Sequence, residues 1–136
     1  MKNRSLKQIG IAVCMAPFVL ALFWFHCRPV VALHYSAQAR ESIGFFFNDN
    51  HNTAKQGLEP GESVVFPTAM FPDSSMWILL TFPFDSKDSL EITKPFSRID
   101  VCIGPGAKIE RTEIRHGFFA RFTEPSIPCR ISDSGR

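Results

Sequence analysis

The stretch Met76-Trp-Ile-Leu-Leu-Thr-Phe82 is a nearly continuous apolar run bounded by Pro83. A run of this length predicts a buried strand. Proline cannot donate to a strand ladder, so Pro83 is expected to end it. We therefore predict that residues 76–82 form a central strand of a sheet, covered on both faces.

Short apolar stretches recur on both sides of this run, separated by clusters of glycine, proline, asparagine and aspartate. This spacing predicts an all-β sandwich or barrel. Lys108–Arg115 is charged at most positions and suits a sheet edge. Val30–Tyr35 reads either as a first strand or as a helix that restarts after Pro29. The other expected strands cover residues 43–47, 63–66, 89–92, 99–103 and 118–122.

The fold class predicted for the body of the protein is thus mainly β, a small antiparallel β-sandwich. Seven or eight strands in about 105 residues give it the size of one immunoglobulin-like domain. No motif of a known family is present, so the family stays unassigned. The turn at Leu58-Glu-Pro-Gly-Glu62 is expected to place its glycine at positive φ.

Charge divides unevenly along the chain. Lys2, Arg4 and Lys7 give the first seven residues a charge of +3, whereas the chain from Arg28 onward carries 12 basic and 13 acidic side chains. The body therefore has no basic field that would hold nucleic acid, and no nucleic-acid partner is predicted.

An apolar segment follows this basic tail. Residues 9–25 contain no ionisable group apart from Cys14 and would form a helix about 26 Å long. Pro17 predicts a kink, and the aromatic cluster Phe23-Trp24-Phe25 would lie at one membrane interface. The basic residues before the segment predict a cytoplasmic N-terminus. We therefore expect a transmembrane signal-anchor helix.

Cleavage is the alternative to a retained anchor, because a basic region before an apolar run also fits a signal peptide. The small-x-small sequence Ala37-Gln38-Ala39 is the candidate cleavage site, about a dozen residues beyond Phe25. That distance is large for signal peptidase, so the anchor is preferred. A secreted or periplasmic binding protein released near Ala39 remains the alternative.

The cysteines indicate an oxidising compartment. Cys102 and Cys129 are the two cysteines of the body, and their disulfide would close a 28-residue loop. Two separate buried thiols are the alternative. The Cys102–Cys129 disulfide would leave Cys27 unpaired, and a homodimer bridged through Cys27 is a further expectation.

Motifs for catalysis or metal binding are missing. The histidines are scattered, with no two at metal-ligand spacing, and no nucleophile elbow is present. Asn48, Asn50 and Asn52 imitate a calcium loop, but Thr53 stands where that loop needs glycine. No cofactor, metal or catalytic residue is therefore predicted, and the protein is not expected to be an enzyme. A small hydrolase using Asp49, His51 and His116 in a polar pocket is kept as a second alternative.

Consecutive phenylalanines predict an interaction patch. In a strand, neighbouring side chains point to opposite faces, so Phe45-Phe46-Phe47 cannot all enter one core. The same holds for Phe118-Phe119. Phe46, Phe118 and Phe119 are the candidate patch for a protein or lipid partner, and full burial of these rings in the sandwich is the commoner alternative.

The sequence thus predicts four segments: a cytoplasmic basic tail (1–7), a transmembrane signal-anchor helix (8–28), a linker or first strand (29–42) and an extracytoplasmic β-sandwich (43–136). The expected location is a bacterial-type inner membrane, which binds the protein through the N-terminal helix. The expected role is a protein-interaction or envelope accessory module whose partner the sequence does not identify.

Overall fold

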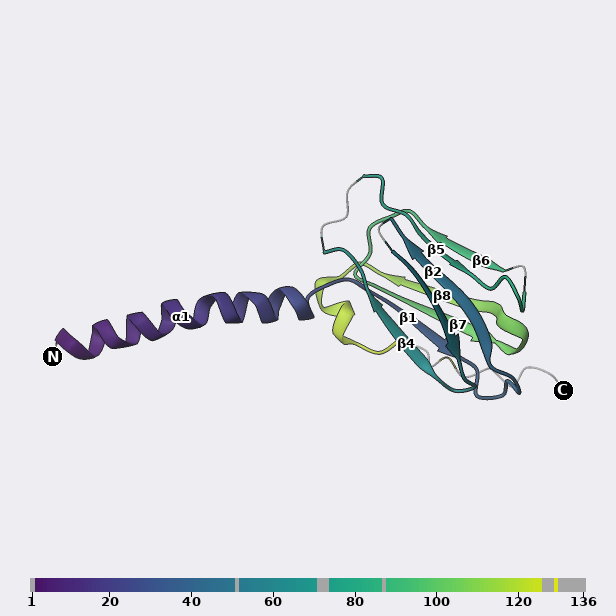
Figure 1. The fold of residues 1–136 in the computed structure, drawn as a ribbon, viewed down its shortest axis with the longest axis horizontal. Helices are drawn as coiled ribbons and strands as arrows, with labels where there is room; N and C mark the ends of the chain where they lie inside the picture. The colour runs from purple at the N-terminus through teal and green to yellow at the C-terminus, as the bar shows by residue number, and fades with distance from the viewer. Residues whose placement is uncertain (1, 51, 71–73, 87, 126–128, 130–136) are drawn as a thin grey trace.

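Alternating side chains give the body two sheets that face each other across one core (Figure 1). The computed structural model describes residues 2–50, 52–70, 74–86, 88–125 and 129. The strand order is β4-β1-β7-β8 in one sheet and β3-β2-β5-β6 in the other. The elements are α1 (Lys2–His26), β1 (Val30–Tyr35), β2 (Ile43–Asp49), β3 (Thr53–Leu58), β4 (Ser63–Pro67), β5 (Ile78–Thr81), β6 (Ser89–Ile92), β7 (Arg98–Gly104), η1 (Pro105–Ala107), β8 (Lys108–Arg115) and η2 (Phe118–Phe122).

The core lies between the inner faces of the two sheets. β1 contributes Val31, Leu33 and Tyr35, and β7 contributes Ile99, Val101 and Ile103. Phe45 and Phe47 enter the same core from β2, and the Phe47 ring stacks on Phe66 at a centroid distance of 4.3 Å. The mainly β fold with two antiparallel-rich sheets is therefore confirmed.

Val30–Tyr35, which the sequence left ambiguous, is a strand inside its sheet. β1 pairs antiparallel with β4 on one side and parallel with β7 on the other. The β1–β7 pair departs from the all-antiparallel sandwich that the sequence predicts. The sandwich therefore begins at Val30, within the segment 29–42 that the sequence predicts to be a linker or first strand.

Residues 76–82 are only partly as predicted. β5 lies between β2 and β6, so its central position is confirmed. Ile78 and Leu80 are buried in the core, but Leu79 and Thr81 are half-buried on the outer face. The expectation of full cover on both faces was wrong, because Leu79 and Thr81 stay partly exposed on the outer face of this sheet.

Two other local predictions had opposite outcomes. Gly61 has φ +81°, and Glu62 N–H donates to the Glu59 carbonyl at 2.9 Å, so the predicted turn is confirmed. Phe118–Phe122, by contrast, is the short 3-10 helix η2 and not a strand. β8 ends at Arg115, and the chain then folds back instead of pairing as a further strand.

α1 leaves the sandwich and continues through Pro17 without a break (Figure 1). Within the described residues, no helix is both long enough and apolar enough to cross a bilayer. The predicted transmembrane span therefore has no support from the described residues.

Candidate functional site

Polar side chains form an ordered array on the outer face of the β4-β1-β7-β8 sheet. The inward residues of β7 are aliphatic, so strand alternation turns its polar residues outward. The register places them beside the outward residues of the neighbouring strands. The array consists of Ser63 of β4, His34 of β1, Arg98, Asp100 and Cys102 of β7, and Arg111, Glu113 and Arg115 of β8.

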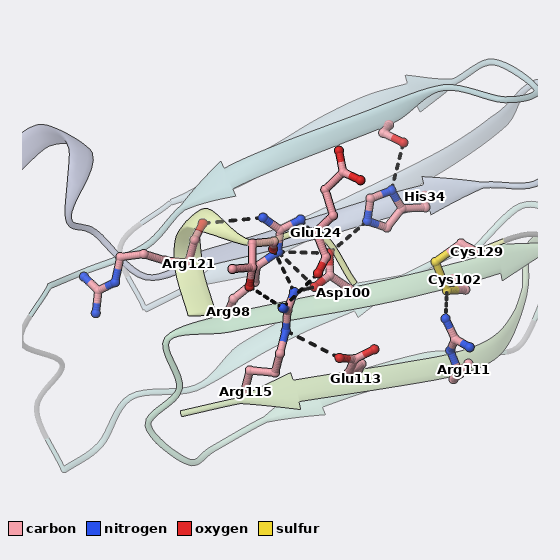
Figure 2. Close-up of polar contacts among 12 residues, drawn as sticks. His34, Arg98, Asp100, Cys102, Arg111, Glu113, Arg115, Arg121, Glu124 and Cys129 are labelled. Atoms are coloured by element: carbon pink, nitrogen blue, oxygen red, sulfur yellow. Dashed lines mark hydrogen bonds and ion pairs between the residues drawn. A yellow bond between two sulfur atoms is a disulfide. The ribbon is translucent and has the colours of Figure 1, made fainter. Parts of the chain in front are cut away.

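Asp100 is the centre of this array and is 1% exposed. Its carboxylate accepts hydrogen bonds from Arg98 Nε and Nη2 at 2.8–3.1 Å, from Arg115 Nη2 at 2.6 Å and from His34 Nε2 at 3.0 Å (Figure 2). Each bond is charge-assisted on the acceptor side, and all except the bond from His34 come from two guanidinium groups. The buried carboxylate is thus paired with more than one cation.

Hydrogen bonding determines the acidity of this carboxyl group. Burial alone would raise the pKa of Asp100, but the hydrogen bonds from Arg98, His34 and Arg115 outweigh burial. They lower the pKa of Asp100 from 3.8 to about 2. Asp100 is therefore ionised throughout the physiological range and does not serve as a proton donor there.

This shift predicts an acid-dependent loss of stability. A carboxyl group with a lowered pKa in the folded state stabilises the fold above its unfolded pKa, and the contribution is lost as the pH falls through the folded value. We expect the free energy of unfolding to fall by about 2 kcal/mol from this group between about pH 4 and pH 2. Urea unfolding across that range measures it. An Asp100→Asn variant whose stability falls equally steeply would show that the slope comes from other groups.

Arg98 and Arg115 also hold the C-terminal segment, residues 118–125, against the sheet. Arg98 Nη1 donates to the Arg121 carbonyl at 3.4 Å. Arg115 Nη1 donates to Thr123 Oγ1 at 2.7 Å and to the Glu124 carbonyl at 3.0 Å. The Asp100 cluster, defined as His34, Arg98, Asp100 and Arg115, therefore links the sheet to the chain that covers it.

His34 extends the cluster to Ser63. His34 Nδ1 lies 2.9 Å from Ser63 Oγ, while Nε2 bonds to Asp100. With a neutral ring, Nε2–H donates a hydrogen bond to Asp100 and Nδ1 accepts a hydrogen bond from the Ser63 hydroxyl. This Ser63–His34–Asp100 relay contains the three residue types of an acyl-transfer site. The ring nitrogens are used in the reverse of the usual sense, and neither cavity described below is lined by Ser63 or His34.

The predicted cysteine pair meets at the edge of the array. Cys102 and Cys129 lie with Cα atoms 5.4 Å apart, which suits a disulfide, and Arg111 Nη2 lies 3.6 Å from Cys102 Sγ (Figure 2). The disulfide-compatible pairing is therefore confirmed. Cys27 is 4% exposed, so a bridge to a second copy would first require this residue to become accessible.

The predicted patch residues are not brought together. Phe46 lies on the outer face of the β3-β2-β5-β6 sheet, where its ring centroid is 6.3 Å from that of Phe84. Lys55 Nζ lies 5.7 Å from the centroid of the Phe46 ring. Phe118 and Phe119 lie in η2, beside the end of α1 (Figure 1). They form two separate aromatic clusters.

The residues of the hydrolase alternative do not form a described pocket. Asp49 lines a cavity of about 450 Å³ near the end of α1, together with Trp24 and Arg28, and His116 is not among its described lining residues. His51 lies outside the described residues. Asp49 Oδ1 accepts from the Asn52 N–H at 2.7 Å, an arrangement typical of a turn. In the described chain no three His, Cys, Asp or Glu side chains converge as metal ligands.

A second open hollow, of about 430 Å³, lies at the far end of the sandwich from α1. Its polar lining includes Arg40, Glu41 and Asp85. Tyr35 reaches it and donates its hydroxyl proton to the Glu41 carbonyl at 3.0 Å. Burial raises the pKa of Tyr35, with further increases from the nearby Asp85 and Glu41 charges. This phenol therefore remains neutral at physiological pH and acts there as a hydrogen-bond donor.

Sequence reasoning missed the Asp100 cluster, although Arg98 and Asp100 lie within one short strand.

Comparison of the chain with known protein families, with curated proteins and with solved structures found no match.

Proposed function

We propose that this protein is a membrane-anchored interaction module, in which α1 enters a bilayer as a single-pass anchor and the β-sandwich lies on the extracytoplasmic side. The observation that carries the proposal is the surface of α1. Every described side chain between Ile11 and Phe25 is exposed, and these residues are apolar around the whole helix. A helix that is apolar on all sides requires lipid or protein around it.

The position of β1 favours a retained anchor over release. Cleavage after Ala39 would detach β1, which pairs with a strand on each side and supplies Val31, Leu33 and Tyr35 to the core. A sandwich released at that site would lose an interior strand. The disulfide-compatible pair further supports an oxidising compartment for the body.

A charge placed in α1 tests the anchor. Leu20→Lys is expected to weaken membrane insertion by about 3 kcal/mol, because a lysine near the centre of an inserted helix is costly. Glu91→Lys, on an exposed position of β6, is the matched control. The measurement is the share of full-length protein that stays with membranes after alkaline carbonate extraction. Equal retention of Leu20→Lys and Glu91→Lys, or release of the unmodified protein, would contradict the proposal.

The interaction role is tested by site-specific photocrosslinking in intact membranes. Val65 is an exposed position of β4, and the exposed Phe84 follows β5 and packs beside Phe46 on the outer face of the other sheet, so each reports one face of the sandwich. The proposal predicts one discrete adduct at one of the two positions, and that position identifies the binding face. Absence of a discrete adduct at both would contradict an interaction module.

Hydrolysis is the second candidate function, and the Ser63–His34–Asp100 relay is the observation that favours it. The relay ranks second because Asp100 already pairs with two arginines and no described cavity adjoins Ser63. A fluorophosphonate probe tests the two readings. The interaction module predicts no adduct on Ser63, whereas labelling that disappears in both Ser63→Ala and His34→Ala would establish a hydrolase.

A further inference from the structure

We propose that η2 is a second membrane contact, whose phenylalanines enter the lipid interface beside the last turns of α1. This inference rests on the proposed function, since it takes α1 to lie in a bilayer. It adds that the sandwich is held against the membrane surface at a second point.

The first observation is the exposure of the aromatic rings. η2 has the sequence Phe-Phe-Ala-Arg-Phe, and its rings Phe118, Phe119 and Phe122 are 43%, 76% and 55% exposed. Phe118 contacts both other rings, with centroid distances of 5.3 Å and 6.2 Å. They form one apolar cluster that contributes nothing to the core between the sheets.

The second observation is the position of this cluster. The Phe118 ring stacks on Phe23 of α1 at a centroid distance of 6.3 Å. Figure 1 shows η2, in yellow, at the end of the sandwich that α1 enters. The η2 rings are therefore continuous with the exposed aromatic end of α1, Phe23-Trp24-Phe25. Aromatic side chains of inserted helices concentrate at this depth of a bilayer.

The third observation is that side chains of β7 and β8 hold η2 in place. Arg98 donates to the Arg121 carbonyl, and Arg115 donates to Thr123 and Glu124 immediately after η2. The Ala120 N–H donates to the Gly117 carbonyl at 2.9 Å. The element that presents the rings is thus fixed to the sheet.

Charge around the rings favours lipid as the occupant. The Arg121 guanidinium lies 4.5 Å from the Phe118 ring centroid and donates through Nε to the Phe118 carbonyl at 2.8 Å. Arg28 lies at the same end, two residues after the last residue of α1. A cation beside apolar rings matches the boundary between lipid phosphates and acyl chains. A second copy of the chain is the competing occupant and is an outcome of the test.

The test places a single tryptophan at chosen positions of the full-length protein in phosphatidylcholine–phosphatidylglycerol vesicles containing brominated lipids. One protein keeps Trp24 and carries Trp77→Phe. The others carry Trp24→Phe and Trp77→Phe with either Phe119→Trp or Phe84→Trp. Phe84 is the matched control, because it is 72% exposed but lies at the far end of the sandwich.

The expected result is loss of emission by lipid quenching at positions 24 and 119 and none at position 84. Quenching at 24 without quenching at 119 would overturn this inference and leave the anchor standing. Absence of lipid quenching at position 24 would overturn the proposed function itself. If position 119 is unquenched by lipid and its emission shifts with protein concentration, the rings contact a second copy and the inference is wrong.

Discussion

Replacing Asp100 by asparagine is expected to lower the free energy of unfolding by about 3 to 5 kcal/mol. Asp100 is buried and pairs with Arg98 and Arg115. Removing its charge takes the Asp100 anion away from both guanidinium groups in a largely desolvated site, and Arg115 keeps the longer ion pair to Glu113 at 3.5 Å. The asparagine Nδ2 would also point a donor at groups that themselves donate.

Glu91→Gln is the matched control, because it makes the same chemical change on an exposed position of β6. Its effect should stay within about 0.5 kcal/mol. Urea unfolding of the full-length variants in detergent measures both. A cost below about 1 kcal/mol for Asp100→Asn would show that the Asp100 cluster does not stabilise the fold.

Breaking the Cys102–Cys129 pair is the second large effect. Replacing both cysteines by serine is expected to cost about 3.5 kcal/mol, because the cross-link closes a 28-residue loop in the unfolded chain. The pair also holds position 129 against the sheet that carries the Asp100 cluster. Its loss should therefore weaken the arginine bonds to residues 121–124.

Cys14→Ser serves as the control, since Cys14 is a free, exposed cysteine of α1. Urea unfolding with and without a reductant measures the effect. Reductant should lower the stability of the unmodified protein and leave the double-serine variant unchanged. If reductant has no effect on the unmodified protein, the two cysteines are not cross-linked.

The parts of the fold that follow from local alternation were predictable. Phe45 and Phe47 face the core while Phe46 faces out, as strand geometry requires. The charged strand β8 lies at the edge of its sheet, as its charged composition predicts. β3 was missed, because Thr53–Leu58 has one buried side chain and is a strand mainly through its pairing with β2.

Long-range contacts explain the other errors. Residues 118–122 have the apolar composition of a strand, but side chains of other elements hold this part of the chain. Arg98 of β7 donates to the Arg121 carbonyl, and Arg115 of β8 donates to Thr123 and Glu124 just after η2. Asp100 occupies an outward position that the alternating pattern assigns to solvent. It is buried because residues 121–124 return over this face of the sheet and are bound there by Arg98 and Arg115. The cysteine pair was the one sequence signal that this return occurs.

The most direct test of the account is the side of the membrane on which the sandwich lies. A cysteine introduced at the exposed position Glu91 should react with a membrane-impermeant maleimide in intact spheroplasts, while the unmodified protein stays unlabelled. We expect the same labelling before and after lysis, with the labelled protein in the membrane fraction. Labelling that appears only after lysis, or a labelled protein that is free of membranes, would contradict it.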